Sequence, residues 1–162
     1  MKYFTIRELC RSQTAERRGI INYPSQEVVA NLTFLIEHLL DPIRKRVGKP
    51  ININSGYRSP ELNKAIGGST TSAHCKGQAA DIECFGLDNY QLAKIIYKEF
   101  KYDQLILECY KEGDPSSGWV HIAIRKPPAQ NRQLTMTYNR KDKYSEYQFS
   151  RTKQPNGNTA DA

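Results

Sequence analysis

The sequence predicts a single α+β domain in which helices come first and short strands follow. An amphipathic helical repeat fills residues 31–48, and apolar or alternating segments of strand length recur from residue 51 onward. The loops between these later segments are short, which favours a small, mostly antiparallel sheet flanked by helices. The length of 162 residues suits one domain with its own hydrophobic core.

Three helices are expected from apolar spacing and from residues that begin or end a helix. In residues 31–48 the apolar side chains recur at helical spacing, and Pro42 should kink or split the helix. A shorter helix is expected in residues 59–66, with a proline near its first position. A third is expected in residues 88–100, where the Asp88 side chain can cap the first turn.

Five short segments predict strands because they combine apolar or β-branched residues with turn-forming residues at their ends. They read "PININS", "QAADIECF", "YDQLILEC", "WVHIAI" and "RQLTMTY". In "WVHIAI", alternation places His121 on the opposite face from Val120 and Ile122. The apolar content falls after the last strand, so we assign residues 1–143 to the domain and residues 144–162 to a flexible C-terminal tail.

The formal net charge is +7, from 24 basic and 17 acidic residues. The excess lies at the two ends, since residues 1–50 and residues 111–162 each hold nine basic and five acidic residues. A basic surface suits polyanions such as nucleic acid or bacterial wall polymers, although a solvated basic face would have the same composition. No nucleic-acid-binding motif is present, so we expect no nucleic-acid partner.

Features of a membrane-spanning or signal-bearing chain are not apparent in the sequence. No run approaches the roughly 18 consecutive apolar residues of a membrane-spanning helix. The segment "MKYFTIRELCRSQ" has neither a long apolar stretch nor a small-residue cleavage site. We therefore expect a protein that is made in the cytoplasm without a signal peptide and that does not span a membrane. We also expect a monomer.

A candidate metal site begins with the segment "SAHCKGQAAD", residues 72–81. His74 precedes Asp81 by seven positions in a loop rich in small residues, so the loop can turn back and bring both side chains to one ion. His121 on a later strand can supply a third ligand, and hydrolytic zinc sites commonly have three protein ligands and one water. A solvated loop histidine is the simpler alternative, and a solvated position is the interpretation that we favour for His38.

Three motifs resemble those of the zinc D-Ala-D-Ala carboxypeptidases and murein endopeptidases, which share a fold with the N-terminal domain of Hedgehog proteins. The family pattern S-x-H-x-x-G-x-A-x-D, followed by W-x-H, is matched by Ser72, His74, Gly77, Ala79, Asp81, Trp119 and His121. The upstream signature S-G-Y-R-S stands at residues 55–59, and the resemblance extends over residues 4–140. It implies a Hedgehog-like fold with one zinc ion on His74, Asp81 and His121 at the edge of the sheet.

The resemblance also implies hydrolysis of peptide bonds, for which a zinc-activated water needs a carboxylate as general base. In several branches of the family this acid lies three positions before the last histidine, where this sequence has Gly118. Glu108, which ends an otherwise apolar strand, is the best replacement, and Asp114 is the alternative. Arg58 can stabilise the oxyanion or hold a carboxylate of the substrate through its planar pair of donors.

Together these features predict a zinc metallopeptidase that hydrolyses peptide bonds in bacterial peptidoglycan, as a carboxypeptidase or as an endopeptidase. A phage lysis or tail-associated enzyme that acts at the cell wall would have these features, and so would a bacterial cytoplasmic enzyme. The alternative is a non-catalytic module that retains the fold and the zinc and binds cell wall or protein. The open assignment of the general base keeps this alternative in play, because a binding module needs no base, and hydrolysis of isolated bacterial walls with and without a chelator would separate the two hypotheses.

Overall fold

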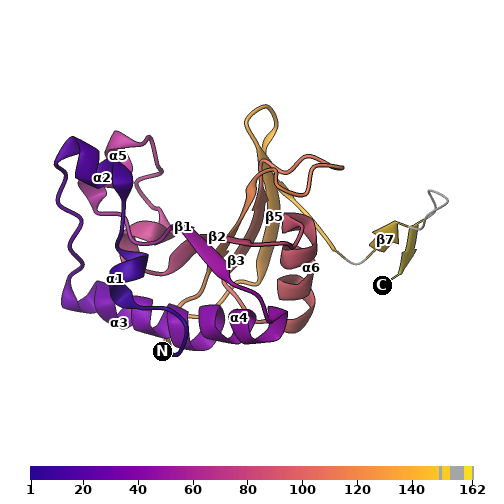
Figure 1. Ribbon diagram of the computed structural model, residues 1–162, viewed down its shortest axis with the longest axis horizontal. Coiled ribbons are helices and arrows are strands. Elements are labelled where there is room, and N and C mark those ends of the chain that lie inside the picture. The colour runs from indigo at the N-terminus through magenta and orange to yellow at the C-terminus, as the bar shows by residue number, and fades with distance from the viewer. Residues whose placement is uncertain (150, 154–158, 162) are drawn as a thin grey trace.

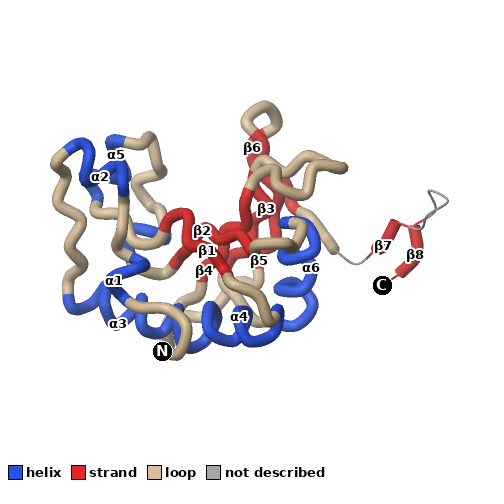
Figure 2. Tube along the Cα trace, in the orientation of Figure 1, coloured by secondary structure: helices blue, strands red, loops and turns tan. Residues whose placement is uncertain are grey.

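The computed structural model describes residues 1–149, 151–153 and 159–161. It is a single α+β domain built on a six-stranded sheet with the strand order β1-β2-β4-β3-β5-β6 (Figures 1 and 2). The strands of this sheet are β1 (Ile51–Ser55), β2 (Ala79–Cys84), β3 (Gln104–Glu108), β4 (Trp119–Ala123), β5 (Leu134–Asn139) and β6 (Lys143–Glu146). A separate two-stranded sheet pairs β7 (Arg151–Lys153) with β8 (Thr159–Asp161).

The main sheet is mixed. Four of its five strand pairs are antiparallel, whereas β3 and β5 run parallel. The parallel pair arises because the chain leaves β4, crosses over in residues 124–133 and joins the far side of β3. The expectation of a mostly antiparallel sheet is therefore only loosely right, and the fold is not a close match to the Hedgehog-like fold that the resemblance implies.

Helices precede the sheet and alternate with its strands. After α1 (Ile6–Leu9) and α2 (Gln13–Arg18), a long helical segment consists of α3 (Gln26–Leu35), the π-helical turn η1 (Ile36–Leu40) and α4 (Asp41–Val47). The expected disruption at Pro42 takes the form of this π turn, since proline has no N–H to donate to the preceding turn. Later helices are α5 (Pro60–Ala65), the 3₁₀ helix η2 (Ala73–Lys76) and α6 (Asn89–Glu99). Among the described residues, no helix combines the length and the apolar character that crossing a membrane requires.

The two faces of the sheet differ because side chains alternate along each strand. Ile82 on β2, Val120 and Ile122 on β4, and Leu105 and Leu107 on β3 are buried in the hydrophobic core. Buried leucine and isoleucine side chains of α3, η1, α4 and α6 complete that core. In Figure 1 the long helical segment runs along the bottom of the view, and α6 stands at its right end. Asp81, His121 and Glu108 alternate with these core residues along β2, β4 and β3, so their side chains lie on the opposite face of the sheet.

The strand order places β2, β4 and β3 in the interior of the sheet. Asp81 on β2 and His121 on β4 therefore lie on one face of the central strands, and the predicted location at the edge of the sheet is wrong. The reason is physical: the place of a strand within a sheet depends on pairing between distant segments, which the pattern within one strand does not encode.

The chain continues to pack on the domain beyond residue 143. β6 pairs with β5, and the Phe149 side chain is fully buried against the rings of Tyr90, Tyr97 and Tyr147. These contacts fall in the segment predicted as a flexible tail from residue 144. Residues 150, 154–158 and 162, which that tail also includes, lie outside the described part of the chain.

Candidate metal centre

The local backbone holds His74 in a buried position. His74 lies in η2, where the Ser72 side chain accepts a hydrogen bond from the His74 N–H, and only 2% of the residue is exposed. The ring Nδ1 lies 2.7 Å from the carbonyl oxygen of Gly56. Because a carbonyl oxygen only accepts hydrogen bonds, Nδ1 carries the proton, and the lone pair of Nε2 is free to bind a metal.

The pairing of β2 with β4 brings Asp81 and His121 together, since the two residues lie directly opposite each other. The Oδ1 atom of Asp81 is 3.0 Å from Nδ1 of His121 and 3.3 Å from Nε2 of His74. The other ring nitrogen of His121, Nε2, lies 3.3 Å from the amide oxygen of Gln104. With the proton on Nε2, His121 donates to Gln104 and the lone pair of Nδ1 faces Asp81; with the proton on Nδ1, His121 donates to the Asp81 carboxylate.

These three side chains form a donor set that fits a zinc ion. Their ligand atoms all lie within 4.8 Å of one another. With the ring protons on Nδ1 of His74 and Nε2 of His121, two imidazole lone pairs and a carboxylate oxygen face one region, and a cation there would be attracted to all three. Two nitrogen ligands and one oxygen ligand are a common protein donor set of hydrolytic zinc sites, in which a water takes the fourth position.

Burial and mutual contact set the protonation of the ligands. Burial lowers the pKa of His74, which keeps its imidazole neutral. Burial alone would raise the pKa of Asp81, but in the metal-free chain attraction to His74 and hydrogen bonds donated by His121 and His74 hold that pKa well below its usual range. A neutral imidazole and an ionised carboxylate are the forms that bind a metal, so the ligands are prepared for it.

Arg58 lies beside the metal ligands in the turn that follows β1. Its backbone N–H donates to the carbonyl oxygen of His74 over 3.2 Å, which ties the turn to η2. In the guanidinium group, Nη1 donates to Oδ1 of Asn63 at 3.1 Å, and Nη2 lies 3.8 Å from Oδ2 of Asp81. Asn63 uses one of the five guanidinium donors, so the group is held next to Asp81 and keeps donors for a substrate.

Two further residues, Asn22 and Gly56, shape this turn, and neither has a role predicted from the sequence. The side chain of Asn22 donates to the carbonyl oxygen of Tyr57 at 3.1 Å and accepts from the backbone N–H of Ser59 at 2.7 Å. A Cβ on Gly56 would overlap the carbonyl oxygen of Leu9, to which the Tyr57 N–H donates at 2.7 Å. The glycine in S-G-Y-R-S hints at such a close approach, whereas Asn22 lies far from the motif in sequence and gives no signal.

A cavity of about 410 Å³ adjoins the three ligands, and its lining includes Arg58, Glu108, Gln104 and Tyr144. Glu108 ends β3 on the face of the strand that also carries Gln104. Burial and the negative charge of Asp81 raise the pKa of Glu108 above its ordinary value. A carboxylate with increased proton affinity beside a metal site has the property that a general base requires at this location.

Asp114 and Gly118, the other positions considered for the acid, do not offer a carboxylate to this cavity. Asp114 is exposed, accepts a hydrogen bond from the Ser116 hydroxyl at 2.9 Å and is not part of the cavity lining. Gly118 has φ of +66°, and a Cβ there would overlap the carbonyl oxygen of Glu108. Glu108 on β3 pairs with Trp119 on β4, the residue after Gly118. The carboxylate of Glu108 is therefore supplied by the strand next to the position where several relatives have the acid.

Comparison with known protein families assigns most of the chain to one family. The family model described as Peptidase M15 matches residues 2–123, well over half of the chain. The matched region contains the three candidate ligands as well as Arg58 and Glu108. No curated protein sequence matches the chain. From the family match, the chain belongs to the peptidase M15 family of zinc-dependent, D-Ala-D-Ala carboxypeptidase-like peptidases.

Proposed function

We propose that the protein is a zinc metallopeptidase that hydrolyses peptide bonds in the stem peptides or cross-links of bacterial peptidoglycan. The observation that carries the proposal is the cluster of His74, Asp81 and His121 in one cavity with Glu108 and Arg58. Membership of the peptidase M15 family supports a peptide substrate. The net charge of +7 is compatible with an anionic wall polymer.

The residues around the cluster have distinct roles in the proposed reaction. When bound by the cluster, zinc would supply Lewis acidity that lowers the pKa of a water molecule and polarises the scissile carbonyl. Glu108 accepts a proton from the attacking water and later delivers it to the leaving amine. The raised pKa of Glu108 suits this exchange, because a carboxyl with higher proton affinity can both accept and return the proton near neutral pH.

Arg58 has two possible partners on the substrate, and they correspond to two cleavage specificities. In an endopeptidase its guanidinium donates to the carbonyl oxygen on which negative charge develops. In a carboxypeptidase it forms a bidentate pair with the terminal carboxylate of the peptide. Either enzyme could act at the cell wall as a phage lysis or tail-associated protein, or could process wall peptides inside a bacterium.

The test is hydrolysis of isolated bacterial walls and of synthetic stem peptides by the purified chain. We expect activity that a chelator abolishes and that added zinc restores. Analysis of the released products separates the two specificities, since a carboxypeptidase releases terminal alanine and an endopeptidase releases larger fragments. Binding to walls without any hydrolysis in the presence of zinc would contradict the proposal and would favour a binding module of the same fold.

A further inference from the structure

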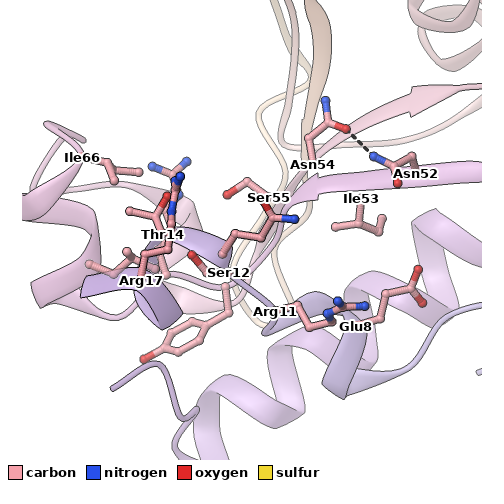
Figure 3. A pocket seen from close by; sticks show the side chains of 14 residues that line it. Glu8, Arg11, Ser12, Thr14, Arg17, Asn52, Ile53, Asn54, Ser55 and Ile66 are labelled. Atoms are coloured by element: carbon pink, nitrogen blue, oxygen red, sulfur yellow. Dashed lines mark hydrogen bonds between the residues drawn. The ribbon is translucent and has the colours of Figure 1, made fainter. Parts of the chain in front are cut away.

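A second cleft lies beside the metal centre, between helices α1 and α2 and the outer edge of β1. Its volume is about 590 Å³. Figure 3 shows Asn54 and Ser55 of β1 on one side of this cleft and Thr14 and Arg17 of α2 on the other. Arg58 lines both this cleft and the metal cavity. The two cavities therefore adjoin at Arg58, so an extended peptide that passes this residue could contact both.

The ionisable lining of this cleft is mainly cationic. Three arginines, Arg11, Arg17 and Arg58, contribute to it together with one acidic residue, Glu8. The exposed side chains of Arg11 and Arg17 form no hydrogen bond or ion pair with the described residues. Their guanidinium groups are therefore available to a ligand, and the ligand group that matches their planar donors best is a carboxylate or another planar anion.

The opposite wall of the cleft favours an extended chain. β1 is the first strand in the order of the sheet and pairs only with β2 among the described strands. Its outer edge can therefore offer backbone N–H and C=O groups to a peptide in extended conformation, which is how edge strands bind peptides in many complexes. Residues 52–55 of this strand line the cleft.

We infer that this cleft is a subsite for the acidic part of an extended peptide substrate, whose carboxylates pair with Arg11 and Arg17 while its backbone follows β1. The inference rests on the proposed function, because it adds a second binding region to the same substrate. Peptidoglycan stem peptides carry free carboxylates along their length and so have the required chemistry. Arg58 lies where the subsite and the metal cavity meet.

The test compares two forms of one synthetic stem peptide, with its side carboxylates free or amidated, on the zinc-loaded full chain. The double variant Arg11→Gln/Arg17→Gln should raise KM for the carboxylate form about tenfold, as the loss of two partly solvated ion pairs predicts, with kcat little changed. KM for the amidated form should not change. The matched control Arg7→Gln/Arg18→Gln removes the same charge at nearby positions in α1 and α2 that lie outside the cleft lining, and it should leave both KM values at the wild-type level.

Equal KM effects of the two double variants would overturn the inference, because general charge would then explain the result. An unchanged KM for the carboxylate form in the Arg11→Gln/Arg17→Gln variant would overturn it as well, while leaving the hydrolytic function intact. If no variant hydrolyses either peptide, the proposed function fails, and binding measured by NMR titration of the zinc-loaded chain decides about the subsite. In these titrations, tighter binding of the carboxylate form than of the amidated form by the wild-type chain and by the Arg7→Gln/Arg18→Gln control, but not by Arg11→Gln/Arg17→Gln, supports the subsite. If the wild-type chain binds the two forms equally, the subsite is contradicted.

Discussion

Gly56→Ala should weaken both the fold and the metal site, because residue 56 links them. The new methyl group would overlap the carbonyl oxygen of Leu9 and lie 2.9 Å from two further backbone atoms of that residue. Separating the two segments breaks the hydrogen bond from Tyr57 N–H to Leu9, which costs about 1 kcal/mol. The added crowding costs about 1–3 kcal/mol, so the free energy of unfolding should fall by about 2–4 kcal/mol. The shift also moves the Gly56 carbonyl that orients His74, and loss of such a contact weakens metal binding by about 10–100-fold.

Urea unfolding of the metal-free chain measures the first effect, and competition with a chelator measures the zinc affinity. Gly48→Ala is the matched control, since Gly48 ends α4 at φ +67° with no atom within 4 Å of the added Cβ. Its backbone strain should cost about 1 kcal/mol and leave zinc affinity unchanged. Wild-type zinc affinity in a Gly56→Ala chain that has lost the expected stability would refute the argument that this carbonyl positions His74.

Three further predictions concern the residues around the cluster. Glu108→Gln should keep the zinc content and lower kcat by about 10²–10⁴-fold, because the base is lost while the ligands remain. Asp114→Asn should have little effect on kcat. If peptide hydrolysis shows the reverse ranking, the role of base belongs to Asp114. Arg58→Lys should lower kcat at constant zinc content if the guanidinium acts on the transition state, and it should raise KM if the guanidinium anchors a terminal carboxylate. Full activity of Arg58→Ala on both terminal and internal peptide bonds would exclude both roles. The raised pKa of Glu108 means that folding favours its protonated form, so Glu108→Gln should stabilise the metal-free chain at neutral pH. That gain should vanish as the pH falls below the ordinary glutamate pKa of about 4.3, and a melting temperature difference that does not depend on pH would contradict the assignment.

Residues whose position follows from a local pattern could be predicted from the sequence. Alternation in "WVHIAI" separates His121 from Val120 and Ile122, and the structure buries both aliphatic side chains in the core on the other face of β4. Asp88 caps α6 through a hydrogen bond to the N–H of Tyr90, as expected from its place before a helical repeat. The three candidate ligands could be named because imidazole and carboxylate chemistry belongs to the side chain itself.

Features that depend on distant pairing or on backbone atoms could not be predicted. The site lies on the face of central strands because β3 and β4 continue the sheet beyond β2, which no single segment reveals. The roles of the Gly56 carbonyl and of the Gln104 amide in orienting the two histidines follow from contacts across 18 and 17 residues of chain. Phe149 is buried although the composition around it is polar, because one aromatic side chain can pack into the core without changing the average hydropathy of its segment.

The central claim is that His74, Asp81 and His121 bind one zinc ion through two nitrogens and one oxygen. Zinc X-ray absorption on the full chain loaded with one equivalent of the metal tests it most directly. The predicted spectrum has only nitrogen and oxygen ligands at about 2.0–2.2 Å, with stoichiometric binding that is lost in His121→Ala. Sulfur ligands at about 2.3 Å from the free cysteines, or undiminished zinc binding in His121→Ala, would contradict the account.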